Sequence, residues 1–159
     1  EIVDGKWTEK HMNSIIANYS RTRYFERYSL LLDESFLRVK NFYMLSEINL
    51  FFINMICSLL GINTEIKSSR EYSLSGKKSD RIMLLCKQAG AKFYLTGPAG
   101  NRYIDRKAFS ESGIKVIVAD YSGYPEYNQL YPPFRHEVTI FDLIFNTGPD
   151  AIKYMKKFI

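Results

Sequence analysis

Acid–base chemistry in this 159-residue chain would depend on a few carboxylates and on two histidines. The carboxylates that suit a general acid or base are Asp105, Asp120, Glu126 and Asp142. Parallel sheets bind ligands beyond the carboxyl ends of their strands, and Asp120 ends a predicted strand, so it is the favoured base. Asp142 would lie in the first turn of a helix, where it suits the helix dipole as well as catalysis. His11 is a third catalytic candidate, although a lone histidine beside an apolar helix face is more often a packed residue.

No self-sufficient catalytic or metal-binding motif is present. The chain has no P-loop, no GxSxG, no HExxH and no paired Cys/His spacing, and its GPAG run is too short for a dinucleotide fingerprint. We therefore expect neither a metal nor a cofactor. Cys57 and Cys86 lie in apolar helical settings without CxxC spacing, which favours buried thiols over a disulfide and indicates a reducing compartment.

Composition indicates one globular domain over residues 1–159, with 46% hydrophobic and 25% charged residues. The net charge of +5 comes from scattered basic residues, which favours a role in solubility and makes nucleic acid an unlikely partner. Aromatic residues reach 15%, which suits a lined pocket and equally suits an AT-rich genome. The irregular segment 121–134, with three prolines and four tyrosines, is typical of a binding loop or lid.

Hydrophobic spacing predicts an α/β fold: a short, mostly parallel sheet packed by several helices, with an all-helical amino-terminal part. The predicted strands are residues 63–67, 92–96 and 115–119, the last two joined by a crossover. The predicted helices are residues 6–19, a segment from about 24, 44–60, 76–88, 139–147 and 150–158. Helix 44–60 is apolar on most of its circumference, so we expect it to be the core helix, covered on nearly all sides. Its apolar stretches are too short for the roughly 20 residues of a membrane span.

Several short motifs, taken in order, resemble the WbqC-like protein family from about Trp7 to Gly148. The motifs are Trp7-Thr8-Glu9-Lys10-His11, Tyr24-Phe25, Glu47-Ile48-Asn49, Ser68-Ser69, Tyr94-Leu95-Thr96-Gly97 with Gly100 and Tyr103, Gly113-Ile114, Tyr127 with Gln129, and Ile140-Phe141-Asp142-Leu143 with Phe145-Asn146 and Gly148. The resemblance implies a bacterial cytoplasmic protein of surface-polysaccharide (O-antigen) biosynthesis. It also implies transfer of glycine, or another acyl or aminoacyl group, to a sugar.

Two features depart from that family. Its members usually open with a further segment, so we expect this chain to be the carboxy-terminal part of a longer one. The residues before the Asp142 helix, Arg135 to Val138, are more polar than the family pattern. Two alternatives to the enzyme remain open: a non-catalytic binding or scaffold protein of the same pathway, and a single-stranded RNA-binding protein.

An anion site is predicted in two loops that follow predicted strands. Ser68, Ser69 and Arg70 offer hydroxyls, backbone amides and a guanidinium that could hold the anionic part of a nucleotide-sugar or activated amino acid. The simpler interpretation of the two serines alone is a helix cap or a turn. Gly97 and Gly100 would let backbone amides approach the same group.

The remaining predicted contacts would recognise the acceptor. Tyr103, Tyr127 and Gln129 would bind the hydroxyls of the sugar, with Asn101 in the neighbouring glycine loop and Asp120 as the base. All of these residues are expected at one edge of the sheet. The sequence indicates no oligomeric state.

Overall fold

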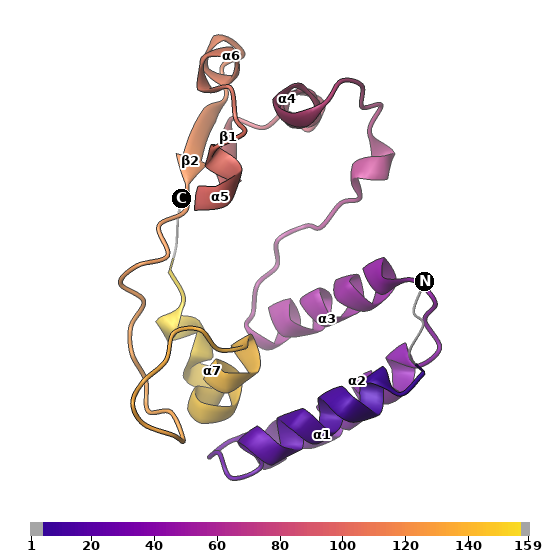
Figure 1. Cartoon of the computed structure of the whole chain (residues 1–159), viewed down its shortest axis with the longest axis vertical. Coiled ribbons are helices and arrows are strands. Elements are labelled where there is room, and N and C mark those ends of the chain that lie inside the picture. Colours follow the sequence, from indigo (N-terminus) through magenta and orange to yellow (C-terminus); the bar gives the residue numbers. More distant parts are fainter. Residues whose placement is uncertain (1–4, 157–159) are drawn as a thin grey trace. The chain divides into compact units, whose positions relative to one another are not determined.

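The structure is a computed structural model that describes residues 5–156, and it divides into two compact units (Figure 1). Among the described residues, the helical unit comprises residues 5–63 and 124–156, and the sheet unit comprises residues 64–123. Both strands lie in the sheet unit, so the chain is a helix-rich α/β protein, as predicted.

The helical unit contains four α-helices and one 3-10 helix within its described residues. They are α1 (Trp7–Tyr19), α2 (Phe25–Val39), α3 (Leu45–Leu59), α7 (Ile140–Thr147) and η2 (Gly148–Tyr154). The four α-helices confirm the predicted segments to within one or two residues. The last predicted helix, 150–158, is wrong as an α-helix, and its final residues lie outside the described ones. Gly148 ends α7 with a φ of 59°, and Pro149, which lacks an amide hydrogen, begins the tighter helix.

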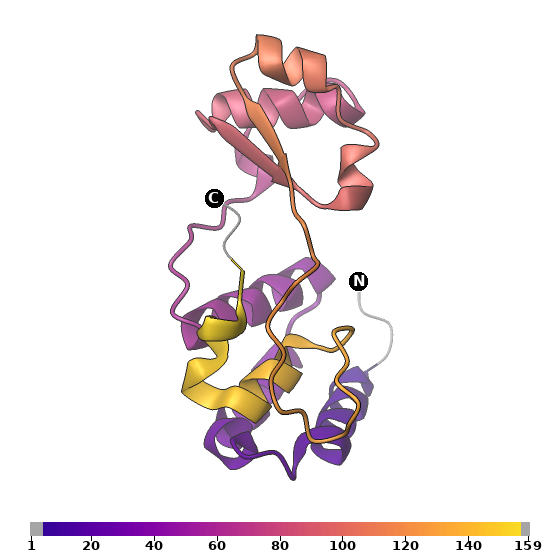
Figure 2. The same ribbon diagram turned by 90° about the vertical axis from the view of Figure 1, so that its left-hand side faces the viewer.

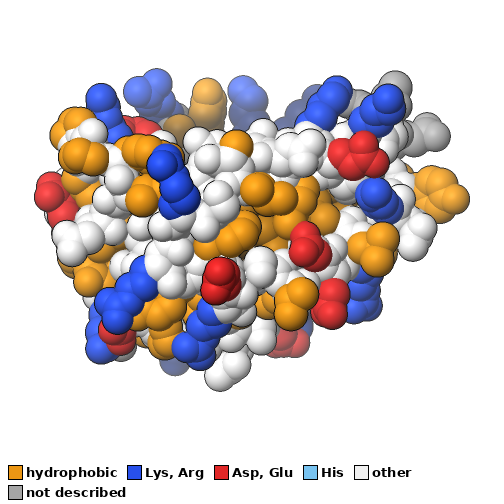
Figure 3. All heavy atoms as spheres, turned by 90° about the horizontal axis from the view of Figure 1, so that it is seen from below, with side chains coloured by type: hydrophobic (Ala, Val, Ile, Leu, Met, Phe, Trp, Pro, Cys, Tyr) orange, Lys and Arg blue, Asp and Glu red, His pale blue; other side chains and the backbone are white. Residues whose placement is uncertain are grey.

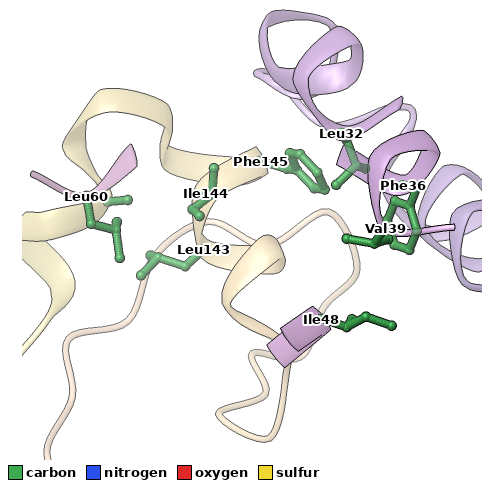
Figure 4. Close-up of a cluster of buried hydrophobic side chains, with 9 residues drawn as sticks. Leu32, Phe36, Val39, Ile48, Leu60, Leu143, Ile144 and Phe145 are labelled. Atoms are coloured by element: carbon green, nitrogen blue, oxygen red, sulfur yellow. The ribbon is translucent and has the colours of Figure 1, made fainter. Parts of the chain in front are cut away.

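The core of the helical unit is organised around α7. Leu143, Ile144 and Phe145 of this helix are buried in one cluster with side chains of α2 (Figure 4). The ring of Phe145 lies 5.2 Å from that of Phe25 and 5.5 Å from that of Tyr19, measured between centroids. Aromatic contacts at these distances add to the free energy of burying the rings.

The prediction that residues 44–60 form the core helix is wrong. Ile48 is the one buried residue in α3, all of whose residues are described, and Leu50 and Ile53 are 45% and 48% exposed. Apolar residues occur on all sides of α3, but only one side of the helix packs against α2 and lines the pocket. The hydrophobic content of a helix does not show how many other elements pack against it. The eight-residue α7, not α3, lies at the centre of this core.

The sheet unit is a small βαβ arrangement. Its elements are η1 (Ser69–Glu71), α4 (Lys78–Gln88), β1 (Phe93–Thr96), α5 (Pro98–Asn101), α6 (Arg106–Glu111) and β2 (Lys115–Val118). Strands β1 and β2 are parallel, with Tyr94 opposite Val116 (Figure 2), which confirms the predicted crossover. These two side chains pack on a core of Cys86, Phe109 and Ile114.

The third predicted strand, 63–67, is wrong. The segment has no ladder partner among the described residues, and all five of its residues are exposed. Ile66 is its one large apolar residue after Asn63, and the side chains of Glu65 and Lys67 pair with each other at 3.3 Å. With a single large apolar residue, this segment can bury too little apolar area to be held against the sheet as an edge strand.

Candidate functional site

An open pocket of about 520 Å³ lies within the helical unit. Its volume falls in the range of about 300–1,000 Å³ that is common for small-molecule sites. Residues of α1, α2, α3 and the start of α7 line it: Trp7, His11, Ser14, Ile15, Asn18, Tyr19, Phe36, Leu45, Ile48, Asn49, Phe52, Thr139 and Phe141. The walls are therefore mostly aromatic and aliphatic, with hydroxyl, amide and imidazole groups at a few points.

Folding brings these side chains together through helical spacing. Trp7, His11, Ile15 and Tyr19 recur every three or four residues of α1, so they share one face of that helix. The ring of Trp7 packs on that of Phe36 from α2, at 6.2 Å between centroids. The pocket is thus a direct result of how α1 and α2 present their aromatic faces.

His11 is the candidate general base that lines this pocket. Its Nδ1 lies 2.8 Å from the carbonyl oxygen of Trp7, one turn earlier in α1. A carbonyl oxygen only accepts, so Nδ1 carries the hydrogen, and in the neutral imidazole Nε2 keeps its lone pair. The edge of the Trp7 ring also contacts the imidazole, at 5.5 Å between centroids. These two contacts fix the orientation of the ring and its tautomer.

Asp142 is buried, with 7% of its surface exposed, and two side chains donate to its Oδ1. The Tyr127 hydroxyl donates at 2.7 Å and the Gln129 amide at 3.0 Å. Asp142 is the third residue of α7, where the amino-terminal end of the helix favours a negative charge. Thr139 accepts a hydrogen bond from the Phe141 amide and caps the helix. The structure thus joins three of the predicted site residues in one network.

Tyr19 links this network to the pocket. Burial raises the pKa of its hydroxyl, and the charge of Asp142 and a hydrogen bond with Asp142 raise it further. The pKa of Tyr127 is also raised well above its ordinary value, first by burial and then by its hydrogen bond to Asp142. Both phenols therefore stay protonated donors across the physiological pH range. Asp142 does not line the pocket, whereas Tyr19, whose pKa it raises, does.

Gln129 holds the loop that follows it. Its amide nitrogen donates to the Arg135 carbonyl, and its amide oxygen accepts from the Arg135 amide, both at 2.8 Å. The ring of Tyr127 packs edge-on against Phe134 and Tyr154. The irregular segment predicted at 121–134 is therefore held in place by the hydrogen bonds of Tyr127 and Gln129 to Asp142.

The predicted anion-binding serines form the cap of η1 in the sheet unit. The Ser68 hydroxyl accepts from the Arg70 amide at 3.2 Å, and the Glu71 carboxylate accepts from the Ser68 amide at 2.8 Å. This reciprocal arrangement is a capping box. Ser68, Ser69 and Arg70 are all exposed.

The two glycines of the next loop lie at the carboxyl end of β1. A side chain on Gly97 would meet the Tyr121 hydroxyl at 2.9 Å, so this loop and the segment after β2 touch at the same sheet edge. A side chain on Gly100 would overlap the Thr96 hydroxyl. Beside them, Asn101 accepts two hydrogen bonds from the Arg106 guanidinium, at 2.7 and 3.1 Å, and Tyr103 is exposed.

Asp120 follows β2 and shapes the turn after it. Its Oδ1 accepts from the amide of Ser122 at 2.9 Å and from the hydroxyl of Ser122 at 2.7 Å. This is the geometry of an Asx turn, in which the carboxylate replaces a backbone acceptor. Asp120 belongs to the sheet unit, whereas His11 and Asp142 belong to the helical unit.

A second hollow, of about 430 Å³, lies between α6 and β2. Arg106 and Lys115 line it together with Ser110, Gly113, Ile114 and Val116. None of the predicted site residues lines it among the residues that the structure describes. It differs from the helical-unit pocket in having two cationic side chains in its wall.

Several pocket residues were not assigned to a site from the sequence. Trp7 and Asn49 stand inside runs shared with the resembling family, and that was the available signal. Phe141 likewise stands inside such a run, whereas Tyr19 and Phe52 carry no signal of their own, because aromatic residues on amphipathic helices are usually core residues. Their role as pocket walls follows from the packing of α1, α3 and α7.

The fold and the pocket define a helix-rich α/β protein with a small-molecule-sized site in its helical unit. A profile of the WbqC-like protein family matches residues 1–154, so the chain belongs to that family. The chain is also 36% identical, over 156 residues, to the uncharacterised protein Rv1507c of Mycobacterium tuberculosis, an alignment that covers 98% of this chain and 67% of that protein. No solved structure matches it.

Two further observations concern partners. No helix within residues 5–156 has the length and apolar character needed to cross a membrane. On the face in Figure 3, Lys and Arg side chains are dispersed among hydrophobic and acidic ones, so this face offers no continuous basic patch for a polyanion.

Proposed function

We propose that this chain is a cytoplasmic enzyme of bacterial surface-polysaccharide (O-antigen) biosynthesis that transfers glycine, or another acyl or aminoacyl group, to a sugar. The family resemblance supports the pathway. The helical-unit pocket supports the chemistry, because it combines an aromatic wall with an imidazole whose Nε2 keeps its lone pair. His11 beside this pocket is the observation that carries the proposal.

The reaction that suits this arrangement is acyl transfer by general base catalysis. His11 Nε2 removes the proton from an acceptor hydroxyl as the oxygen attacks the carbonyl carbon of the activated donor. A new carbon–oxygen bond forms, and the tetrahedral intermediate then expels the leaving group of the donor. The imidazolium returns its proton to that leaving group, which restores neutral His11 and balances the step.

Asp142 takes a positioning role in this proposal. It is buried and does not line the pocket, but it holds Tyr127 and raises the pKa of Tyr19, whose ring forms part of the pocket wall. Tyr19 would then present a protonated hydroxyl at a constant position. Asp120 remains an alternative base, although the two hydrogen bonds that its Oδ1 accepts from Ser122 serve the local turn.

The sheet unit is proposed to hold a separate anion site of its own. Ser68, Ser69 and Arg70 would bind the anionic part of a nucleotide-sugar or activated amino acid there, and Gly97 and Gly100 would admit backbone amides to it. Nucleotide-sugars titrated against the wild type and a Ser69→Ala, Arg70→Ala double variant test this assignment. Equal affinities would remove the anion role from these residues.

Turnover tests the proposed activity. The chain is incubated with glycine or acetyl donors in activated form, as thioester, adenylate and aminoacyl-tRNA, together with methyl glycosides as acceptors, and acylated sugar is measured by mass spectrometry. Wild type should form product, and His11→Ala should lower kcat by about 10²–10⁴-fold, the usual contribution of a general base. Asp120→Asn should retain most of the activity.

Two other results would change the conclusion. Loss of activity in Asp120→Asn, with His11→Ala active, would transfer the base to the sheet unit. Binding of a sugar without turnover of any donor would favour the binding or scaffold protein of the same pathway.

A further inference from the structure

The helical-unit pocket has a consistent charge character. Its thirteen lining residues include no Lys, Arg, Asp or Glu, although a quarter of the whole chain is charged. His11 is the one titratable nitrogen in the wall. A phosphate or carboxylate placed in an aromatic pocket without a cation would lose its hydration and gain no counter-charge, which is strongly unfavourable.

Three helices begin at the pocket, and each has a carboxylate of the chain in its first turn: Glu9 in α1, Glu47 in α3 and Asp142 in α7. Leu45 and Ile48 bring the first turn of α3 to the wall, where Glu47 accepts a hydrogen bond from the Met44 amide at 3.2 Å. Thr139 and Phe141 bring the start of α7, where Asp142 lies. Helix amino termini attract anions, but here Glu47 and Asp142 fill that role and would repel a second anion.

The polar groups of the wall are neutral and suit hydroxyls. The Asn18 amide donates to the Ser14 carbonyl, which leaves its oxygen as an acceptor toward solvent or ligand. Among the described residues, no partner is recorded for the side chain of Asn49, so both its donors and its acceptor are available. An amide of this kind can pair with vicinal hydroxyls.

From these observations we infer that the helical-unit pocket binds a phosphate-free sugar ring and excludes phosphorylated ligands. A pyranose has C–H faces that pack on aromatic rings and an equatorial edge of hydroxyls that pair with amides. The rings of Trp7, Phe36 and Phe52 would contact the C–H faces of the sugar. The amides of Asn49 and Asn18 would pair with its hydroxyls. No carboxylate lines the pocket to pair with an ammonium group, which argues against the amino acid as its occupant. The inference rests on the proposed function, in which this ring is the acceptor, and it names which part of the acceptor the pocket takes.

The chain carries a built-in reporter for this site. Trp7 is the only tryptophan in the sequence, and it lines the pocket. Its emission therefore reports on occupation of the pocket without any label. The experiment titrates the purified chain with methyl glycosides of glucose, galactose, N-acetylhexosamines and 6-deoxyhexoses, and with the 1-phosphates of the same sugars.

At least one methyl glycoside should change the Trp7 emission in a saturable manner, and its 1-phosphate should bind at least tenfold more weakly. Asn49→Ala should weaken glycoside binding about tenfold, the effect of losing one well-formed hydrogen bond. Asn54→Ala is the matched control, because Asn54 is an exposed asparagine of the same helix that does not line the pocket. Its affinity should equal that of the wild type, and circular dichroism checks that both variants fold.

Asp142→Asn tests the exclusion of anions. Removal of this charge should narrow the difference in affinity between glycoside and sugar 1-phosphate. An equal or tighter affinity of the wild type for the phosphates would overturn the inference, as would no response of Trp7 to any glycoside. Equal losses in Asn49→Ala and Asn54→Ala would also overturn it. Failure of the turnover assay with intact glycoside binding would overturn only the proposed activity.

Discussion

The two units of this chain differ in how they bury their side chains. In the helical unit, nine buried hydrophobic residues among those described form one cluster, with a ring of aromatic side chains around Phe145. In the sheet unit, the corresponding cluster contains Cys86, Phe109 and Ile114. The helical unit also buries a charged network and encloses a pocket without charged residues, whereas the hollow of the sheet unit has Arg106 and Lys115 in its wall.

This difference teaches where the rule for α/β ligand sites applies. The rule places ligands beyond the carboxyl ends of parallel strands, in a crevice formed by a sheet that is covered on both faces. Here the sheet has two strands, and Phe93 and Leu95 on one of its faces are exposed. Such a sheet offers an edge but little enclosure. The open pocket of about 520 Å³ lies among α1, α2, α3 and the start of α7 instead.

Truncation of the central phenylalanine of each unit should give the largest effects. Phe145 and Phe109 are both fully buried. Phe145→Ala should lower the free energy of unfolding by about 4 kcal/mol, through lost burial and the cavity that remains. Phe109→Ala should have an effect of similar size, but on the sheet unit.

Urea denaturation followed with two probes distinguishes the two variants. Trp7 fluorescence reports on the helical unit, and circular dichroism at 222 nm reports on both. Phe145→Ala should shift the Trp7 transition, and Phe109→Ala should shift part of the dichroism signal more than the Trp7 transition. If both probes move equally in both variants, the units unfold as one cooperative body.

Glycine replacements compare how tightly the units pack. A side chain on Gly148 would lie 2.6 Å from the ring of Tyr24, and the residue has a positive φ of 59°. Gly148→Ala should therefore cost about 3 kcal/mol, from backbone strain and overpacking together. Gly100→Ala in the sheet unit should cost less, because it meets the Thr96 hydroxyl, which can rotate away. Thermal unfolding measures both variants.

Gly61→Ala serves as the control for strain alone. Gly61 has a φ of 68°, similar to that of Gly148, but no atom lies near its added side chain. Gly61→Ala should therefore lower the free energy of unfolding by about 1 kcal/mol. A loss as large as that of Gly148→Ala would show that contact with Tyr24 adds nothing.

Local patterns predicted most of the fold. The periodic apolar residues of α1, α2, α4 and α7, and the glycines after α4 and α7, located these helices to within two residues, and two β-branched runs located β1 and β2. Two of the failures, the strand 63–67 and the core helix 44–60, concerned which elements pack against a segment. The sequence does not show that Ile66 lacks a partner strand, or that α3 is covered on one side only. Helical spacing likewise placed Tyr19 and Phe52 on apolar helix faces. It did not show that these faces leave a pocket between them.

The Asp142 network gives the helical unit a distinctive response to alkaline pH. Tyr127 has an ordinary pKa of 10.0, raised in the folded protein by burial and by Asp142, so its neutral form is favoured by folding. Its contribution to stability is complete below pH 10 and is lost as the pH rises above it toward the folded pKa. Tyr127→Phe should cost about 1 kcal/mol at pH 7, for the hydrogen bond to Asp142.

The test compares urea midpoints of the wild type and Tyr127→Phe between pH 7 and pH 11. The stability of the wild type should fall more steeply than that of the variant above pH 10, so the difference between them should shrink. Tyr103→Phe in the sheet unit is the control, since Tyr103 is exposed. Parallel curves for the wild type and Tyr127→Phe would contradict the role of Tyr127.

The smallest effect is expected at the cap of η1, where the sheet unit uses a hydroxyl for its own backbone. Ser68→Ala removes the acceptor of the Arg70 amide and should cost about 0.5–1 kcal/mol. Ser69→Ala is the matched control, because it removes a neighbouring exposed hydroxyl for which no bond is recorded in the described part of the chain. Ser68→Ala should have a lower denaturation midpoint than Ser69→Ala. If Ser69 binds a ligand, Ser69→Ala should instead be the variant that binds nucleotide-sugars more weakly. Equal stabilities would mean that Glu71 alone, through its bond to the Ser68 amide, is enough to hold the turn.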